Sequence, residues 1–446
     1  MNVPDLKRRA WLMASASAML PLAAAGATAA TPGVAAAFTS ASAPLLAALT
    51  PPAVAPAALA TDDAYWQRVA AQYDVTDDVA MLDNGYWGSM ARPVVAAYQR
   101  HVEEVNRGNA LYGRLEFPAE YEAARGAVAN ALGVHQDEVV LTLGATEALQ
   151  ALIGGYNRLE RGDTVLCADI DYDNMLTTMH WLRQRRGVNV VRIALPEPAT
   201  YDAVIDCYAQ AIAMYPKLRM MLLTHVNHRN GMVLPVAEIG SMARTRGIDV
   251  ICDTAHGFGQ LDMRIPDLQV DFAGINLHKW IGAPVGIGAI YIRRGRVRAI
   301  DPYMGESDGD DIRTRIHTGT INFAAYLSLP LALQLHEQIG VANKQARLHH
   351  LRNRWVDAAR DIGGVQLLAA ADPRLTSAIA SFRVHGQTSV ADNAALSRRL
   401  LREHGVFAVW RDGLASGACV RVTPSIFTSN AQVDRLVTGL EAVART

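Results

Sequence analysis

The chain has 446 residues, of which 50% are hydrophobic and 19% are charged, and its formal net charge is −1. This composition is that of a soluble globular protein. The near-neutral charge argues against a nucleic-acid partner, which would favour a basic face, and no block of like charge indicates a binding tail.

The first thirty residues have the layout of a signal peptide. Lys7, Arg8 and Arg9 precede a weakly apolar stretch that runs to Ala25, and the small residues around it suit a cleavage site. This stretch is short and contains Pro21, which argues against a stable membrane-spanning helix. The adjacent arginines indicate twin-arginine export, so we expect a periplasmic or secreted protein. A Sec-type signal and an untargeted start are the alternatives.

A segment of Ala, Pro, Ser and Thr with almost no charge follows the signal peptide. It covers residues 31–61 and predicts a flexible linker. Ordinary composition begins at Asp62. We expect residues 62–92 to pack with a small C-terminal domain.

Short apolar runs alternate with helical patterns in a large domain predicted over residues 93–326. Many of the runs are apolar on both faces, as in a parallel sheet that helices cover on both sides. We therefore predict a doubly wound, mainly parallel α/β domain whose ligand site lies beyond the carboxyl ends of its strands. The predicted strands are at residues 138–144, 163–168, 188–195, 218–226, 247–253, 270–276 and 286–294.

The last part of the chain, residues 327–446, predicts a connecting helix and a smaller α+β domain. The helical pattern runs from Leu327 to about Ile362. Two strands are expected after it, at residues 377–384 and 418–425.

A strand, a turn at Gly144 and a helix follow one another in the stretch LTLGATEALQALIGGY. The amides of Ala145 and Thr146, with the Thr146 hydroxyl, open that helix. Free N–H groups and the positive end of the helix dipole suit a phosphate. An ordinary N-cap at Thr146 explains the same pattern.

Asp253 ends the strand-like run VICD, three residues before His256. A carboxylate in that place can keep a pyridine nitrogen protonated, which makes the ring an electron sink. The alternative is a helix cap or a surface charge.

Lys279 lies in the apolar stretch INLHKWIGAPVGIG, where an unpaired amine is unfavourable. Desolvation lowers the pKa of an amine and makes it nucleophilic toward an aldehyde. The alternative is a lysine whose end reaches solvent.

Arg421 lies in another apolar, strand-like run, ACVRVTPS. A guanidinium binds a carboxylate through two parallel hydrogen bonds, so Arg421 is a candidate for holding a substrate carboxylate. An internal salt bridge is the alternative.

The order of these segments resembles the class V aminotransferase family of enzymes that use pyridoxal 5′-phosphate (PLP) and have fold type I. The similarity is greatest to isopenicillin-N-epimerase-like proteins. It covers roughly residues 65–446 and rests on the segments MLDNGYWGSM, GATEALQ, DTAHG, NLHKWIGAPVGIG, HTGT and RVTPSIFTS. The resemblance implies a large doubly wound domain and a smaller α+β domain.

The resemblance also implies how the cofactor is held. Lys279 would carry PLP as an imine and move protons at the α-carbon of the substrate, and Asp253 would pair with the pyridine nitrogen. His256 would lie near the ring hydroxyl, and Tyr172 would stack on the pyridine face. The phosphate would be held by Gly144, Ala145, Thr146, Asn276 and His278.

The remaining implied roles concern the substrate and a second subunit. Arg421 would hold the substrate carboxylate, and Asn84 is expected to contact the substrate with it. Thr320, in the HTGT segment, would reach the phosphate of the neighbouring subunit, which implies a homodimer. His228 stands where many relatives have Asn, so the resemblance leaves open whether His228 contacts the oxygen on the PLP ring.

Two departures from cysteine desulfurases argue against sulfur transfer. Tyr172 replaces their histidine, and the stretch GVFAVWRDGLASGA before Arg421 has no cysteine. Cys419 falls inside a predicted strand. Asp83 also replaces the asparagine that is usual in the early segment of epimerase-like relatives.

We therefore expect an exported PLP enzyme that acts at the α-carbon of an amino acid or a related amine, with transamination or group transfer favoured. An epimerase and a kynureninase-like lyase are the alternatives on the same scaffold. An inactive binding protein that kept the fold is the alternative from another class, and the intact pair of Asp253 and Lys279 argues against it.

Overall fold

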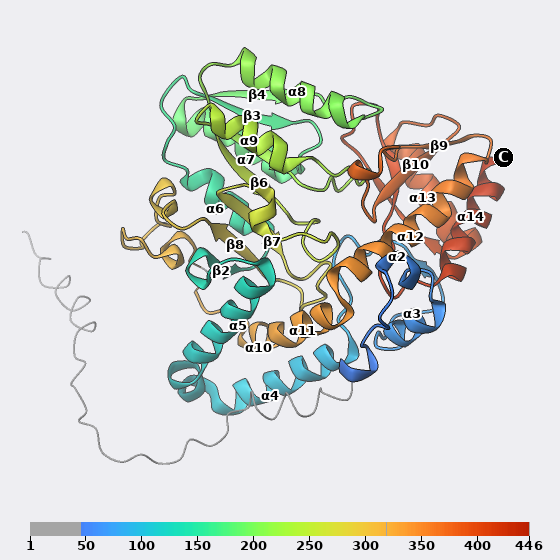
Figure 1. Cartoon of the computed structure of the whole chain (residues 1–446), viewed down its shortest axis with the longest axis horizontal. Coiled ribbons are helices and arrows are strands. Elements are labelled where there is room, and N and C mark those ends of the chain that lie inside the picture. Colours follow the sequence, from blue (N-terminus) through green and yellow to red (C-terminus); the bar gives the residue numbers. More distant parts are fainter. Residues whose placement is uncertain (1–45, 318, 446) are drawn as a thin grey trace, which may run out of the picture. The chain divides into compact units, whose positions relative to one another are not determined.

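The seven strands predicted for the large domain form one sheet in the computed structural model of the protein, which describes residues 46–317 and 319–445 (Figure 1). The predicted signal peptide and the start of the predicted linker lie outside these residues. The strand order is β2-β8-β7-β6-β5-β3-β4. The strands are β2 (Val139–Thr142), β3 (Thr164–Ala168), β4 (Asn189–Ile193), β5 (Leu218–Thr224), β6 (Asp249–Asp253), β7 (Phe272–Asn276) and β8 (Gly288–Ile292).

The strands from β3 to β7 run parallel to one another, and β8 is antiparallel to both of its neighbours, β2 and β7. The expectation of a doubly wound, mainly parallel sheet is therefore confirmed, with β8 as the reversed strand. Because the carboxyl ends of the parallel strands lie at one edge, side chains that follow those strands meet there.

Helices cover both faces of this sheet, which explains why most of its strand residues are apolar and buried. Successive strand residues point to opposite faces, and in β5 Leu222 and Leu223 enter different apolar clusters. The cluster with Leu222 includes residues of α6 (Ala145–Gly155) and α7 (Asp173–Arg186). The cluster with Leu223 includes residues of α5 (Phe117–Leu132), α8 (Tyr201–Met214) and α9 (Val236–Thr245).

The C-terminal elements build a second, smaller sheet (Figure 1). An apolar core around Trp355 and Phe382 belongs to it. The four antiparallel strands of this sheet follow the order β12-β13-β10-β9. They are β9 (Val365–Leu367), β10 (Ala380–Val384), β12 (Val409–Arg411) and β13 (Cys419–Val422). The accompanying helices are α12 (Val341–Arg360), α13 (Val390–His404) and α14 (Asn430–Ala444).

The helical stretch expected from Leu327 to Ile362 consists of two main helices, α11 (Leu329–Ile339) and α12. Gly340 separates them with a φ of +88°, a left-handed conformation that glycine adopts without steric cost and that ends a helix. Two further helices precede them, α4 (Arg92–Leu115) and α10 (Phe323–Leu327).

Residues 46–61 are folded, so the flexible linker predicted for residues 31–61 does not extend to its expected end. Leu49 and Leu59 are buried, and the Trp66 indole N–H donates to the Leu59 carbonyl at 2.8 Å. The segment contains α2 (Pro56–Leu59), and α3 (Asp63–Ala70) follows it. Buried leucines anchor this stretch in spite of its linker-like composition.

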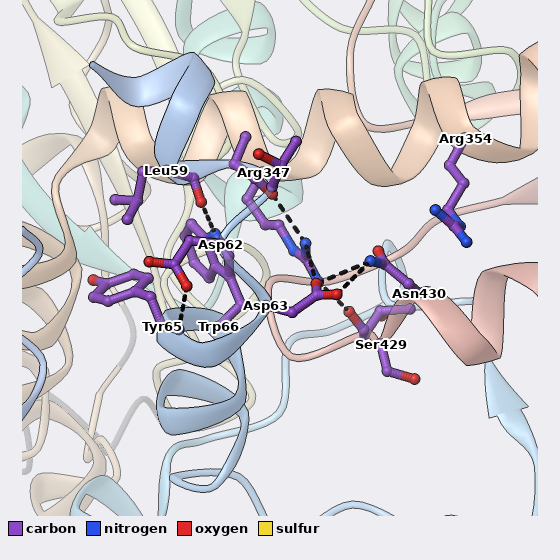
Figure 2. Close-up of polar contacts among 12 residues, drawn as sticks. Leu59, Asp62, Asp63, Tyr65, Trp66, Arg347, Arg354, Ser429 and Asn430 are labelled. Carbon is purple, nitrogen blue, oxygen red and sulfur yellow. Dashed lines mark hydrogen bonds and ion pairs between the residues drawn. The ribbon is translucent and has the colours of Figure 1, made fainter. Parts of the chain in front are cut away.

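Polar contacts fasten the same segment to the small domain (Figure 2). Arg347 of α12 donates to the Ala60 carbonyl at 3.0 Å and lies 3.6 Å from the Asp63 carboxylate. The side-chain amide of Asn430, at the start of α14, donates to Asp63 Oδ1 at 2.9 Å and to Oδ2 at 3.1 Å. Further along, β1 (Ala80–Met81) pairs with β11 (Val406–Phe407).

Within the described residues, no helix is both long enough and apolar enough to span a membrane.

Candidate active site

A cavity of about 990 Å³ lies where the ends of β5, β6 and β7 face the small domain. Thr224, Asp253 and Asn276, the last residues of these three strands, line it. The cavity collects most of the site residues predicted from the sequence, which are Gly144, Ala145, Thr146, Tyr172, His228, Asp253, His256, Asn276, His278, Lys279 and Arg421.

One end of the cavity is built by the start of α6. Thr146 and Glu147 lie in the first turn, where a helix offers no carbonyl to their amides. Gly144 precedes them, and a Cβ at this position would lie 3.1 Å from Asn276 Oδ1 and 3.3 Å from His278 Cε1. The missing side chain therefore keeps a cradle open at a helix N-terminus, which fits a phosphate group.

Three of the predicted phosphate ligands are partly or fully engaged with the protein itself. The Ala145 amide donates to Asn276 Oδ1 at 2.8 Å, so these two groups satisfy each other. His278 Nδ1 lies 2.8 Å from the Ile287 carbonyl oxygen, which leaves Nε2 as the ring nitrogen available to a ligand. Thr146 and His278 are therefore better placed to hold a phosphate than Ala145 and Asn276.

Lys279 is the lysine that lines the cavity. The sequence contains four lysines, and Lys7 lies outside the described residues. Lys217 is exposed, and Lys344 is buried against the Trp280 carbonyl and the His336 ring. Burial lowers the pKa of Lys279 to about 8, although the nearby Asp253 carboxylate opposes that change. Lys279 is thus the described amine best suited to attack an aldehyde in the cavity.

The backbone of Lys279 is held by the glycine-containing segment after β1. The Gly88 amide donates to the His278 carbonyl at 2.8 Å. A Cβ on Gly88 would lie 1.8 Å from the Lys279 carbonyl oxygen, so a side chain does not fit there. The motif MLDNGYWGSM therefore packs directly against the lysine, which explains why a glycine is needed at position 88.

Asp253 faces the cavity from the end of β6. The Ala255 amide donates to its Oδ1 at 2.9 Å. Burial raises the pKa of Asp253, and the positive charge of Lys279 partly offsets that effect. A buried carboxylate of this kind is stabilised by a cationic partner in the cavity, and a protonated pyridine nitrogen fits that requirement.

Two histidines complete this part of the cavity. Burial first, and then neighbouring cations, hold the pKa values of His228 and His256 well below the usual range, so both rings are neutral. His256 Nε2 lies 3.0 Å from Lys279 Nζ, and the Tyr172 ring stands perpendicular to the His228 ring at 5.3 Å. In the described chain, Nδ1 of neither histidine has a hydrogen-bond partner, and both atoms are buried.

Arg421 reaches the cavity from β13, and it is also ion-paired inside the protein. Its Nη1 donates to the His228 carbonyl at 2.8 Å, and its Nη2 pairs with the carboxylate of Asp83. Burial lowers the pKa of Arg421 to about 10. Arg421 therefore lines the cavity, as expected of a residue that holds a substrate, and also forms an internal salt bridge, which was the alternative.

Two predicted site residues do not line the cavity. The Asn84 side chain is buried, and its amide group donates to the carbonyls of Met81 and Thr423 at 2.8 and 3.0 Å. It therefore joins two backbone segments, and the expectation that it contacts the substrate is not supported. Thr320 is exposed outside the cavity. Its expected contact is with another subunit and stays a prediction.

The sequence motifs did not single out several residues that line the cavity. Arg411 and Trp410 lie on β12, Tyr86 follows Asp83 in the early segment, and Glu147 accepts the Leu143 amide at 2.7 Å. No spacing signal identifies Arg411. A second arginine in a strand beside Arg421 becomes visible only when β12 and β13 pair.

Comparisons with known proteins agree with this architecture. Isopenicillin N epimerase of Streptomyces clavuligerus is 26% identical over 403 residues, which cover 85% of this chain and 98% of that protein. A probable cysteine desulfurase of Xylella fastidiosa is 26% identical over 418 residues, covering 85% and 96%. A solved mutant of C-DES, with glycine covalently linked to its PLP cofactor, has a TM-score of 0.73 at 20% identity, covers 83% of this chain and 98% of its own, and shares the fold.

The family itself is shown by a broader match. The model described as Aminotransferase class-V matches residues 90–436 of this chain. That span includes the large sheet, Lys279, most of the small domain and Arg421. The resemblance seen in the sequence is confirmed: the chain belongs to the class V aminotransferase family.

Proposed function

We propose that this protein is a PLP-dependent enzyme that acts at the α-carbon of an amino acid or a related amine. The observation that carries the proposal is the joint placement of Lys279 and Asp253 in one cavity, with a pKa of about 8 for the lysine amine. The open helix start at Thr146 supplies the place for a phosphate. Family membership and the PLP of the C-DES structure support the same cofactor.

When bound, PLP supplies an electron sink that stabilises negative charge at a carbon next to the substrate nitrogen. Thr146 and His278 would hold the phosphate, and Asp253 would keep the pyridine nitrogen protonated. Lys279 would hold the cofactor, and its Nζ would be placed to accept the α-proton of a bound substrate. His256, 3.0 Å from Nζ, is positioned to exchange a proton with the lysine.

The fate of that proton separates the candidate reactions. We favour transamination or a related group transfer, because no second described lysine lines the cavity to act as another base. Epimerisation is the second candidate, and the similarity to isopenicillin N epimerase favours it. A kynureninase-like lyase reaction is the third candidate. Sulfur transfer is disfavoured, because Cys419 is buried in β13 and burial raises the pKa of its thiol.

Incubation with a reactive amino acid in heavy water tests this assignment. Deuterium at the α-carbon of the recovered amino acid, together with a keto-acid product and the pyridoxamine form of the cofactor, supports transamination. Deuterated substrate of inverted configuration, with no keto acid, establishes epimerisation. Product formed with the α-hydrogen fully retained contradicts proton removal by Lys279.

Export and dimerisation form part of the proposal. The motif at Arg8 and Arg9 supports export of the folded, cofactor-loaded protein. Replacing both arginines with lysine should leave the protein in the cytoplasm with PLP bound, as cell fractionation would show, and unchanged export contradicts the twin-arginine route.

A homodimer is supported by the expected role of Thr320 and by large exposed apolar side chains near the cavity mouth and beyond it, namely Tyr86, Trp87, Tyr303 and Met304. Light scattering should give twice the mass of the mature chain. A monomer that binds PLP fully would contradict this assignment.

A further inference from the structure

Three charged side chains meet on the small-domain side of the cavity. Arg411 and Arg421 lie on the paired strands β12 and β13, where Arg411 is opposite Cys419 and Arg421 is opposite Val409. The two arginines are therefore diagonal neighbours on one face of the sheet. Asp83 arrives from the segment after β1, and its backbone bridges to Thr423 on the far side of Arg421.

Asp83 is shared unequally by the two guanidiniums. It forms a direct ion pair with Arg421 Nη2, whereas Arg411 Nη2 lies 3.7 Å from the same carboxylate oxygen. Arg411 otherwise donates only weakly, from Nη1 to the Trp410 carbonyl at 3.4 Å. Nε of each arginine is buried without a hydrogen-bond partner among the described residues. Arg411 therefore has free donors for Asp83.

The Asp83 contact occupies the edge of Arg421 that a ligand needs. A two-point grip on a carboxylate uses two neighbouring N–H groups of one guanidinium. Nη1 of Arg421 already donates to the His228 carbonyl, whereas Nε has no hydrogen-bond partner among the described residues, so the Nε and Nη2 edge is the one with an unused donor. Asp83 competes for that edge at Nη2, and this competition ends when Asp83 moves toward Arg411.

The charges limit the kind of substrate that fits. Two guanidiniums and one carboxylate leave a single positive charge, and the neighbouring His228 and His256 rings are neutral. One substrate carboxylate balances that charge. A second carboxylate nearby would leave an unpaired negative charge in a poorly solvated place.

We infer that Asp83 is an exchangeable counterion, which holds Arg421 before a substrate carboxylate binds and passes to Arg411 when it does. This inference rests on the proposed function and deepens it. It assigns Arg411 as a positioning residue and names the substrate class as amino acids with one carboxylate and an uncharged side chain.

Aminooxy reagents test this inference on the PLP-loaded protein without a known substrate. Their nitrogen forms the double bond to the aldehyde carbon of PLP, the Lys279 nitrogen leaves, and both amino hydrogens of the reagent pass to it. Methoxyamine has no carboxylate, aminooxyacetate has one, and 2-(aminooxy)succinate has two. The loss of the visible absorption band gives a rate constant for each reagent, and the ratio to methoxyamine measures carboxylate recognition.

The wild-type protein should favour aminooxyacetate over both other reagents. Arg411→Gln should lower the ratio for aminooxyacetate by about tenfold or more, the scale of a hydrogen bond to a charged group, because Asp83 then stays on Arg421. Adding Asp83→Asn to that variant should restore most of the ratio. Asp83→Asn alone should move the preference toward 2-(aminooxy)succinate. Arg298→Gln, which removes an exposed arginine paired with Asp310, is the matched control.

Three outcomes overturn the inference. The first is that Arg411→Gln lowers the rate constants for methoxyamine and aminooxyacetate equally. The second is that the double variant does not recover the ratio for aminooxyacetate. The third is that the wild-type protein reacts equally fast with aminooxyacetate and 2-(aminooxy)succinate. The last needs no variant, so a misfolded mutant does not block the test. A protein that binds no PLP contradicts the proposed function itself, whereas normal reaction with methoxyamine and no dependence on charge contradicts only the counterion exchange.

Discussion

The reactivity of Lys279 gives a prediction whose magnitude follows from its surroundings. Its pKa is about 8, compared with 10.5 for an ordinary lysine. At about pH 7 roughly one Lys279 side chain in eleven is neutral, against about one in 3,000 for an ordinary lysine, which is a difference of about 300-fold. The neutral amine is the form that attacks the aldehyde of PLP, so uptake of PLP by the apoprotein should reflect this difference.

The reactivity of Lys279 is measured by stopped-flow absorbance of PLP uptake, with the reaction of PLP and N-acetyl-lysine as the reference. Ionisations of PLP affect both reactions and cancel in the ratio of the two rate constants. The ratio should stay level below about pH 8 and fall roughly tenfold per pH unit above it, as the reference amine loses its proton. Lys217→Ala should behave as wild type, because Lys217 is exposed outside the cavity. A ratio that stays level up to about pH 10 would refute the reasoning.

Three further predictions follow from the same contacts. Asp253→Asn should retain PLP and lose turnover by about a hundredfold or more, as for the loss of other preorganised charge partners. Steady-state kinetics measure this loss, and near-normal turnover contradicts the role of Asp253 as partner of the pyridine nitrogen. Gly88→Ala should weaken PLP retention, measured by dialysis and absorbance, because a Cβ collides with the Lys279 carbonyl; unchanged retention contradicts that contact. The pKa of Lys344 is about 7 when folded and 10.5 when unfolded, so its buried charge destabilises the protein at low pH and this effect fades as the pH rises. The free energy of unfolding of the wild type, relative to that of Lys344→Met, should therefore rise by roughly 2 kcal/mol between about pH 6.5 and pH 9 in urea titrations. A difference that does not change with pH contradicts this prediction.

The large sheet was predictable because most of its strands are buried on both faces. In the run that ends at Asp253, the three residues before it are apolar on both faces, and a buried parallel sheet gives that signal directly. The short strands β9, β11 and β12 carry no such signal, because they have two or three residues and are partly exposed. The break at Gly340 was missed because glycine also occurs inside helical patterns.

The candidate site was predictable where motifs carry it and not where distant segments meet. Lys279 and Asp253 stand at strand ends in recognisable segments. The pair of Asp83 and Arg421 joins residues 338 positions apart, and Arg411 enters only through the pairing of β12 with β13. Asn84 was predicted to contact the substrate because it lies inside a matching segment. Its side chain instead binds two backbone carbonyls.

The most direct test of the central claim is to locate the covalent cofactor. Borohydride reduction of the purified, PLP-loaded protein fixes the cofactor on the amine that holds it, and peptide mass spectrometry identifies that residue. We predict a phosphopyridoxyl group on Lys279 and none on Lys217 or Lys344, with loss of the visible absorption band. An unmodified Lys279 in PLP-saturated protein, or a label confined to another lysine, would contradict the account.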